Sequence, residues 1–508
     1  MSIQKDKIQI SEIIPQKLDM LTKLVLMIFT AYIMFLTLLN IGYVFHLKGT
    51  FKYIIIVVPV FVACIFIANK LRISKKAFLI CIFILAFCTK ALIAITAGTR
   101  PVSDFKTFYD CAVALQSGNK SWSKWTYFSD WAYQTGPITY YAILIKIFGT
   151  GLLPLKLCNC AFMAGTNTLI YLIARKITNE YAARSVALLY VFYPAPYFLA
   201  SVLTNQHFAA FMFYATIYVL MISKFNFWVR ALLGGIIAAL GNAVRPLGTV
   251  IIAAAIVWCI IELIRTKKVV TIGLVLIMMV TYSTALWGIS SYLIHEDISP
   301  YGLSNNFPLW KFVVGLNEKT SGQYSLEDQS NIFYIDDKHM RDTIAKATIK
   351  ERINIGPKRM LKFMVKKQEV MWGSMDTLRW GFYIYKNKQL VPPEDLKIIE
   401  NRLLKTEKVY YLFALLVLAL GTISLIRQKK NINSVALYVI LLLMGYFFVH
   451  MLIEVQVRYR YFALISVFIL LAYGVQYLVD KYAVLKNKKY TFKASKLLLV
   501  QLERIKNG

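Results

Sequence analysis

The sequence contains few charged residues, and acidic residues are especially scarce. Charged residues occupy 17% of the 508 positions, and Asp and Glu together number 26 against 58 Lys and Arg. Hydrophobic residues make up 58% of the chain, which leaves too little polar surface for a soluble globule of this size. The polar stretch Met1–Met20 also lacks a small-residue cleavage site, so we expect no removable signal peptide. These absences exclude a soluble protein and predict an all-α polytopic membrane protein.

The seven cysteines predict neither a disulfide framework nor a metal site. Most of them, such as Cys64, Cys81 and Cys259, lie inside apolar runs. Cys158 and Cys160 are separated by one residue, which is not a zinc-ligand or disulfide-framework spacing. We therefore expect the cysteines to be small core residues. The chain shows no clear internal repeat or low-complexity tract.

Apolar runs recur along the chain at close to the length that a bilayer requires, which is about 20 residues. We expect about twelve transmembrane helices, two of them short, at 20–44, 53–69, 76–97, 151–175, 184–203, 207–223, 229–244, 246–264, 270–294, 409–426, 433–453 and 459–479. The polar segments between them define six regions. These are 1–97 with the N-terminal segment and first three spans, 98–150 as the first outer loop, 151–294 as a central bundle, 295–408 as a large outer loop, 409–479 with the last spans, and 480–508 as a basic tail.

The net charge of +32 falls mainly on one side of the predicted membrane. Basic clusters near Arg72, Arg175, Arg265 and Arg427 lie between spans on that side. The N-terminal segment around Lys5 and the C-terminal tail fall on the same side. By the positive-inside rule, both termini are then cytoplasmic. The basic charge indicates topology and contact with anionic lipid, so we expect a bilayer as partner and no nucleic acid.

Three segments of the outer loops are expected to be helices that do not cross the membrane. Gly136–Gly151 is apolar but short, and counting it as a span would move every later basic loop to the opposite side. We therefore expect it to be a juxtamembrane helix within the first outer loop. In the large loop, residues 336–355 and 357–373 have the pattern of two amphipathic helices, the second starting at a proline. The large loop is thus expected to be mainly helical.

Ionisable residues gather at the outer ends of the predicted spans. Asp104 and Lys106 follow the third span, Arg245 precedes a proline between two short apolar helices, and Glu454, Arg458 and Arg460 stand at the last helix junction. Charged groups at membrane depth cost a few kcal/mol each on insertion scales, about 2.5–3.5 kcal/mol at the helix centre. Such residues are functional candidates by default, and here they converge on one face.

The order of these motifs resembles the GT-C superfamily of integral-membrane glycosyltransferases. The resemblance rests on the acid in "SDF" of the first outer loop, two juxtamembrane helices, the mid-chain "RP" break, a large outer loop and the late "RYRY", and it covers roughly residues 76–480. The nearest branch contains the aminoarabinose transferases and protein O-mannosyltransferases. The resemblance implies transfer of a sugar from a polyprenyl-phosphate carrier to an acceptor on the extracytoplasmic face of the cell membrane.

The resemblance also implies roles for individual residues. Asp104 matches the acid that the family is understood to use as general base, taking the proton of the acceptor hydroxyl as it attacks the anomeric carbon. Direct displacement would invert that centre. The leaving group is a phosphodiester, which needs positive charge rather than an acid, and guanidinium groups match phosphate oxygens. We expect Arg245, Arg458 and Arg460 to supply that charge, with help from Lys106.

Other polar and aromatic residues on the outer side are expected to contact substrate. These are Tyr109, Gln134, Asn205, Gln206, Trp310, Asn317, Glu454 and Tyr459. Asn205 and Gln206 stand where many relatives have an acidic residue, and neither is a strong ligand for a hard cation. We therefore expect no bound divalent metal and no tightly bound cofactor, with the polyprenyl-phosphate sugar as donor substrate.

Two other classes of function stay open at this point. A lipid-linked polysaccharide polymerase or ligase would also have a large outer loop and outer arginines. A secondary transporter would also be polytopic and basic inside, but it should carry paired halves and polar groups near the bilayer midplane. The sugar is left open, and the acceptor is a lipid, a wall polymer or a protein of the cell envelope.

Overall fold

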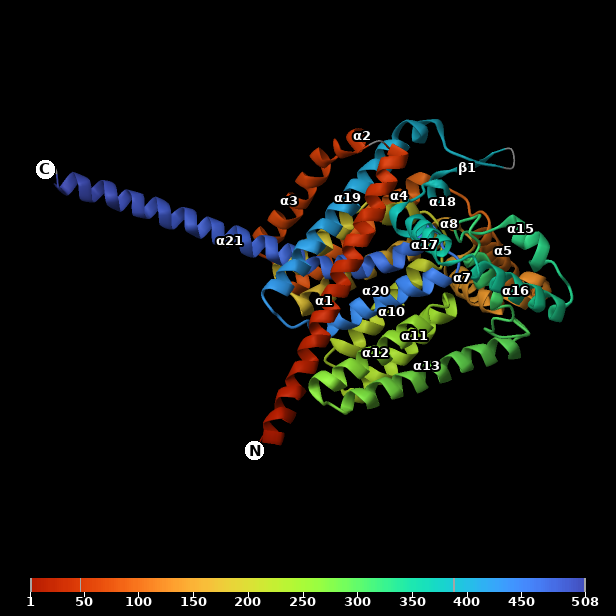
Figure 1. Ribbon diagram of the computed structural model, residues 1–508. Coiled ribbons are helices and arrows are strands. Elements are labelled where there is room, and N and C mark those ends of the chain that lie inside the picture. Colours follow the sequence, from red (N-terminus) through yellow and green to blue (C-terminus); the bar gives the residue numbers. More distant parts are fainter. Residues whose placement is uncertain (1, 46, 387–388, 507–508) are drawn as a thin grey trace.

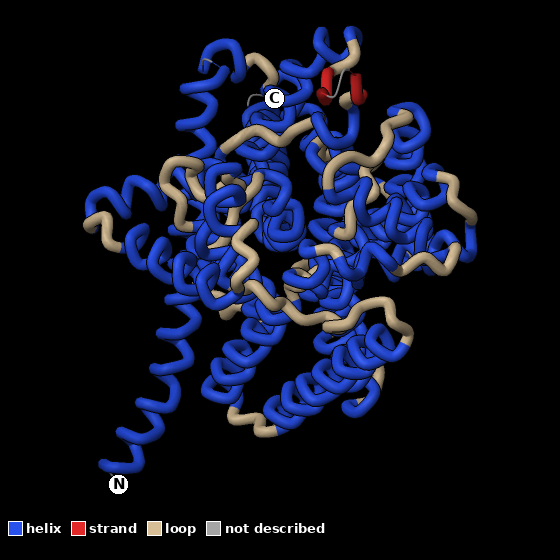
Figure 2. The backbone as a smooth tube through the Cα atoms, turned by 90° about the vertical axis from the view of Figure 1, so that its right-hand side faces the viewer, coloured by secondary structure: helices blue, strands red, loops and turns tan. Residues whose placement is uncertain are grey.

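The protein is almost entirely helical, as the sequence predicts. The computed structural model describes residues 2–45, 47–386 and 389–506. Side chains are described for 13–44, 49–386 and 389–485, so Lys5 and much of the basic C-terminal tail lie outside the part whose side chains are described. Within it, one two-stranded sheet is present, the antiparallel hairpin β1 (Ile384–Lys386) and β2 (Gln389–Val391). Figure 2 shows this hairpin at the edge of a molecule otherwise made of helices and loops.

Ten helices of the described residues contain a segment long and apolar enough to cross a membrane. They are α1 (Ser2–Phe45), α3 (Ile54–Lys70), α4 (Lys75–Ala97), α8 (Leu152–Ile177), α11 (Phe227–Val244), α12 (Gly248–Thr266), α13 (Val270–His295), α19 (Glu394–Arg427), α20 (Ser434–Leu452) and α21 (Arg460–Lys506). Each corresponds to one of the expected spans. The protein is thus a multi-pass membrane protein.

The two remaining expected spans are shorter than predicted. The stretch 184–203 contains α9 (Glu180–Phe192), which has 13 residues, and then a separate 3₁₀ turn, Ala195–Leu199. Pro194 and Pro196 end the helix because proline has no N–H group to continue it. The stretch 207–223 forms α10 (Gln206–Met221), an apolar helix of 16 residues. The number twelve is reached only when these two helices are counted with the ten.

The outer loops contain the helices that the sequence predicts there. The first loop holds α5 (Asp104–Gln116), α6 (Thr126–Asp130) and α7 (Thr135–Phe148), and α7 covers most of the expected juxtamembrane stretch. The large loop holds α14 (Leu309–Gly315), α15 (Leu326–Asp328), α16 (Lys338–Ile353), α17 (Pro357–Gln368) and α18 (Arg379–Phe382). The two expected amphipathic helices are α16 and α17. A further short helix, α2 (Leu47–Phe51), joins α1 to α3.

The two outer loops are joined at one end of the helical bundle. Asp130 of the first loop accepts hydrogen bonds of 2.7 and 2.9 Å from the Arg341 guanidinium of α16, and both side chains are buried. Asn306 adds bonds to the backbone carbonyls of Asp130 and Ser129. In Figure 1, α5, α7, α15 and α16 accordingly lie at one end of the molecule, and both termini lie away from it. Residues that are far apart in sequence therefore meet at this end.

Helices α19 and α21 approach each other closely at two glycines. A Cβ at Gly474 would overlap the carbonyl oxygen of Val417, and a Cβ at Gly421 would overlap the backbone of Gly474. Small residues commonly allow such close approach between membrane helices. Helix α21 is also among the most buried of the ten spans, so this contact lies at the centre of the bundle.

We predict that Gly474→Ala destabilises the bundle, because the Val417 carbonyl group is part of the α19 backbone and cannot move away from the new methyl group. The expected loss is about 1–3 kcal/mol, the usual range for overpacking, measured as a lower unfolding temperature in detergent. Gly288→Ala on α13 is the matched control, since a Cβ there meets nothing within 4 Å. Equal unfolding temperatures for the two variants would contradict the close approach.

Candidate active site

Asp104 is the first residue of α5, at the outer end of the bundle. It follows Ser103, whose φ of 52° turns the chain sharply into the helix. A carboxylate in the first turn interacts favourably with the partial positive charge of the helix N-terminus. The Asp104 side chain is exposed and forms no hydrogen bond within the described residues. It is therefore available to a substrate.

Arg458 approaches this carboxylate from the 3₁₀ turn Val457–Tyr459, which precedes α21. Its guanidinium carbon lies 5.1 Å from the centre of the Phe105 ring and 5.6 Å from those of Trp380 and Tyr459. The Nε atom donates a 2.7 Å hydrogen bond to the side-chain oxygen of Gln456. Gln206 donates to the backbone carbonyl of Arg458 at 3.0 Å. Gln206 thus supports the site from α10.

Arg245 lies on the same aromatic ring as Arg458. It directly follows α11, and its guanidinium carbon is 5.3 Å from the centre of the Tyr459 ring. Its Nη1 donates to the side-chain oxygen of Asn205 at 3.2 Å, and Asn205 in turn donates to the Val244 carbonyl at 2.9 Å. Neither arginine forms an ion pair with a carboxylate of the described residues. The two positive charges next to Tyr459 therefore have no directly paired carboxylate in the described part of the chain.

Lys311 and Glu454 add an ion pair to this group. Lys311, on α14 of the large loop, donates to the Glu454 carboxylate at 2.8 Å. The Glu454 backbone N–H also donates to the Lys311 carbonyl, at 3.2 Å. The charge and hydrogen bond of Glu454 raise the pKa of Lys311 although burial opposes this. Burial works against ionisation of Glu454 too, but Lys311, Gln456 and Arg458 together hold its pKa below the ordinary value.

Asp104 has a different electrostatic balance. Surrounding protein withholds water and raises the pKa of Asp104 above its ordinary value, and Glu454 adds to the rise, while Arg458 and Lys311 oppose it. Two tyrosines belong to the same environment. Burial and then the Asp104 charge raise the pKa of Tyr127. Burial also raises the pKa of Tyr133, and the charges of Lys311, Glu454 and Arg245 act on this pKa. We call Asp104, Tyr127, Tyr133, Arg245, Lys311, Glu454, Arg458 and Tyr459 the Asp104 cluster.

Arg460 does not belong to the Asp104 cluster, contrary to the sequence prediction. Its guanidinium is buried and bonds to Asp376 at 2.5 Å and to Glu407 of α19 at 3.3 Å. It also donates to the backbone carbonyls of Trp372 and Ser374, both at 3.0 Å. With its charge matched and both of its Nη groups engaged, the buried Arg460 is not free to bind a donor phosphate. It is a structural residue that ties α21 to α19 and to the large loop.

Four other predicted site residues are engaged elsewhere. Trp310 is buried against Trp131 and Phe333, and Asn317 is buried and donates to Asp328, so neither is accessible to a sugar. Lys106 pairs with Asp110 on the exposed side of α5. Tyr109 donates to the Thr150 carbonyl at 2.6 Å.

Gln134 lies one residue after Tyr133 in the turn Ala132–Gln134. Its side chain is half-buried and forms no hydrogen bond within the described residues. The structure thus places it next to the Asp104 cluster in the chain without showing a contact, and its role in binding substrate stays a prediction.

Sequence reasoning missed Lys311, Tyr127, Tyr133 and Gln456. Lys311 directly follows Trp310 in the stretch "PLWKF". In this part of the large loop, substrate contacts are predicted from the sequence only for Trp310 and Asn317. Tyr127 and Tyr133 lie in the aromatic-rich part of the first outer loop and resemble interfacial anchors. A signal was present in both stretches, since each contains polar groups at the predicted outer face.

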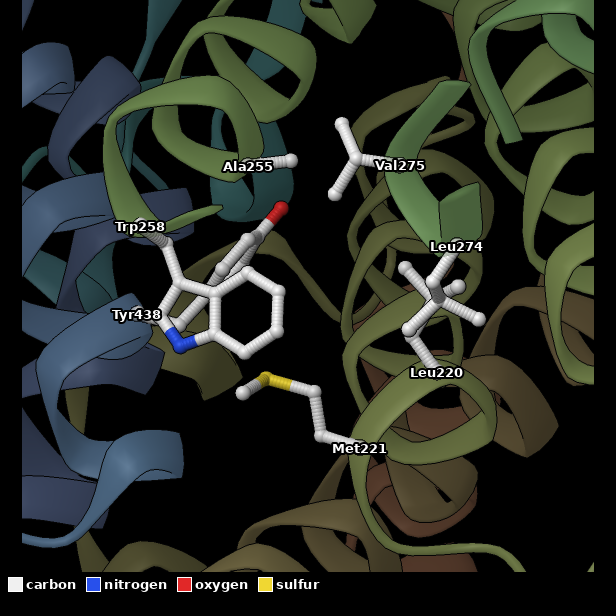
Figure 3. A pocket seen from close by; sticks show the side chains of 7 residues that line it. All are labelled: Leu220, Met221, Ala255, Trp258, Leu274, Val275 and Tyr438. Carbon is white, nitrogen blue, oxygen red and sulfur yellow. The ribbon is translucent and has the colours of Figure 1, made fainter. Parts of the chain in front are cut away.

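An apolar crevice inside the helical bundle does not offer comparable chemistry. The crevice in Figure 3 lies between α10, α12, α13 and α20 and is lined by Leu220, Met221, Ala255, Trp258, Leu274, Val275 and Tyr438. Its walls carry no carboxylate and no basic group. In the part of the chain that the structure describes, no three His, Cys, Asp or Glu side chains are arranged to hold a metal. The absence of a metal in the reaction stays a prediction.

Comparisons with known proteins concern the centre of the chain most directly. The model of the dolichyl-phosphate-mannose-protein mannosyltransferase family matches residues 136–287. This match confirms the resemblance to membrane glycosyltransferases over that segment. The segment includes Asn205, Gln206 and Arg245, but neither Asp104 nor Arg458. No curated protein matches the chain.

Two solved structures of oligosaccharyltransferases are similar to this chain at low sequence identity. One is the archaeal oligosaccharyltransferase AglB from Archaeoglobus fulgidus in complex with an inhibitory peptide and a dolichol-phosphate, at 10% identity and a TM-score of 0.47. The other is the Archaeoglobus fulgidus oligosaccharyltransferase in the apo form, at 10% identity and a TM-score of 0.42. Each alignment covers 82% of this chain and 52% of the other. The chain thus spans about half the length of these structures.

We predict that Arg458→Met and Arg460→Met have opposite consequences. Removal of Arg460 leaves Asp376 without its ion-pair partner and Glu407 with Lys408 alone, and breaking a buried ion pair costs about 3–5 kcal/mol. Arg460→Met should therefore lower the unfolding temperature in detergent strongly. Arg458→Met should leave it nearly unchanged, because no carboxylate pairs with Arg458. A more severe loss of stability in Arg458→Met would contradict these assignments.

Proposed function

We propose that this protein is a glycosyltransferase that moves a sugar from a polyprenyl-phosphate donor to a cell-envelope acceptor. The observation that carries the proposal is the pair Arg245 and Arg458, two arginines without ion-pair partners on one tyrosine ring, beside an accessible carboxylate. The name of the matching family describes a sugar carried on dolichyl phosphate. That donor has the same chemistry as the one proposed here.

The proposed donor site uses the positive charge of the two arginines. A phosphodiester is an anion, and its leaving oxygen gains further negative charge as the bond to the sugar breaks. Guanidinium groups bind phosphate oxygens through paired N–H donors. Lys311 is paired with Glu454 and contributes less net charge. Of the four residues that the sequence predicts for this role, the proposal keeps Arg245 and Arg458 and leaves out Arg460 and Lys106, which pair with carboxylates elsewhere.

Asp104 is proposed as the general base. The acceptor hydroxyl attacks the anomeric carbon, its proton passes to the Asp104 carboxylate, and a new glycosidic C–O bond forms. The bond from the anomeric carbon to the phosphate oxygen breaks, and the polyprenyl phosphate leaves with the electron pair. Attack opposite to the leaving group inverts the anomeric centre. No protein acid is needed, because the phosphate is stable as an anion.

We place this chemistry at the outer face of the cell membrane, with both termini in the cytoplasm. The joined outer loops and the Asp104 cluster lie at one end of the bundle, and the basic clusters belong to the other end. The acceptor class is a lipid, a wall polymer or a protein. Comparing lipid-linked sugars and envelope glycans in cells with and without the gene would identify both the sugar and the acceptor.

We predict that Asp104→Asn abolishes transfer. General bases contribute at least about 100-fold to rate, and an amide cannot accept the proton. The measurement is sugar release from the polyprenyl-phosphate donor by membranes that contain equal amounts of each variant. Asp110→Asn is the matched control on the same helix, since Asp110 is exposed and pairs only with Lys106. An active Asp104→Asn enzyme would exclude Asp104 as the base.

We also predict the direction of pH effects on kcat/KM. Asp104 must be ionised. The surrounding protein keeps part of the water away from this accessible carboxylate and raises its pKa above the ordinary value, so activity should fall as the pH drops through the raised pKa. Arg458→Gln removes a cation that lowers the Asp104 pKa and should move the acid limb to higher pH. Glu454→Gln removes an anion that raises the pKa and should move the limb to lower pH. Movement in the same direction in both variants would refute this electrostatic account.

A further inference from the structure

Gln456 connects the two charged parts of the Asp104 cluster by hydrogen bonds. Its side-chain oxygen accepts a 2.7 Å bond from Arg458 Nε, and its side-chain nitrogen donates a 2.8 Å bond to Glu454 Oε1. The other Glu454 oxygen accepts the bond from Lys311. The result is a continuous chain from Lys311 through Glu454 and Gln456 to Arg458.

The Gln456 position in this chain requires a side chain that both accepts and donates, and an amide does so through two separate atoms. Arginine has donors alone, and an ionised carboxylate has acceptors alone, so the residue between them must accept on one side and donate on the other. These neighbours also determine which amide atom faces which partner. A glutamate would lose the bond to Glu454, and a lysine would lose the bond to Arg458.

The bond to Gln456 leaves the outer edge of the Arg458 guanidinium free. Nε is the atom engaged, while Nη1 and Nη2 form no hydrogen bond with any described residue. Phe105, Trp380 and Tyr459 lie against the group at 5.1 to 5.6 Å, and Gln206 holds its backbone carbonyl. The two free N–H groups form the fork that binds two oxygens of a phosphate.

The same arrangement preserves the positive charge of Arg458. A carboxylate bonded to Nε would neutralise the guanidinium, as Asp376 and Glu407 do for Arg460. The Gln456 amide supplies the orienting bond without charge. The nearby Glu454 carboxylate is itself paired with Lys311, so it competes less for Arg458.

We infer that Gln456 is a positioning residue that aims the Nη edge of Arg458 at the phosphate of the donor lipid. This inference rests on the proposed function, in which Arg458 binds that phosphate. Gln456 acts through Arg458 and is not itself expected to touch the reacting atoms.

The test is a double-mutant cycle on the purified full-length protein in detergent. The probe is polyprenyl monophosphate, and the phosphate-free polyprenol is the comparison ligand. Arg458→Ala should weaken phosphate binding about tenfold or more, the usual scale for losing charge-assisted hydrogen bonds. Gln456→Ala should weaken it about fivefold, and the double variant should bind no more weakly than Arg458→Ala alone. Polyprenol binding should be unchanged throughout.

Gln428→Ala serves as the control. It likewise removes an amide side chain that forms a hydrogen bond, here to Ser424, but Gln428 lies at the far end of α19. If Gln456→Ala does not fold, Gln456→Met, of similar length, takes its place. Additive effects, or equal weakening for polyprenol, would overturn the positioning role while leaving Arg458 as the phosphate ligand. If Arg458→Ala binds the phosphate as wild type does, the phosphate assignment in the proposed function fails, and the role of Gln456 fails with it.

Discussion

Arg458 forms no ion pair with a described residue although it is partly enclosed by protein, while Arg460, two residues later, pairs with two carboxylates. A buried charge without a partner is costly, and proteins usually neutralise it, as Asp376 and Glu407 do here. Arg458 avoids that fate because the aromatic rings of Phe105, Trp380 and Tyr459 lie against it. Rings attract a cation through their electron-rich faces without removing its charge. The group stays available to an anion from outside.

The ion pairs of Arg460 fix the position of the turn that carries Arg458. Arg460 ties the start of α21 to α19 through Glu407 and to the large loop through Asp376, so the turn that carries Arg458 has a fixed position. The loops are fixed in the same way at a second point, where Asp130 and Arg341 join α6 to α16. Tyr127 and Tyr133 belong to the first of these loops and Lys311 to the second. The polar cluster is thus built partly from loop segments that buried charge pairs hold in place.

Sequence reasoning located the end of the bundle at which these residues meet, and the structure does bring Asp104, Arg245, Glu454, Arg458 and Tyr459 together. That success came from counting spans and basic loops, which places residues on one face without any knowledge of packing. Direction within a face was beyond its reach. Arg458 and Arg460 are both arginines followed by a tyrosine, yet they contact different partners because Arg458 lies in the turn Val457–Tyr459 and Arg460 begins α21.

Composition misled in the large loop for a related reason. Trp310 and Asn317 have side chains suited to sugars, but both are buried, Trp310 in a core that the large loop shares with Trp131 of the first loop and Asn317 against Asp328. An outer loop of more than a hundred residues needs its own apolar interior, and a tryptophan there is more valuable for packing than for binding. Lys311, the next residue along α14, cannot be buried without a partner, and it faces Glu454 instead. The helical turn separates the two roles between adjacent residues.

The electrostatics of the cluster connect donor binding to the strength of the proposed base. Without substrate, Arg458 and Lys311 partly offset the effect of burial on the Asp104 pKa. A phosphodiester bound to Arg458 would bring a negative charge that cancels part of this offset, and it would also displace water from the exposed Asp104 carboxylate. Both changes favour the protonated acid. In the proposed mechanism, a bound donor would therefore make Asp104 a better proton acceptor, and the carboxylate would be strengthened when an anomeric carbon is present to be attacked.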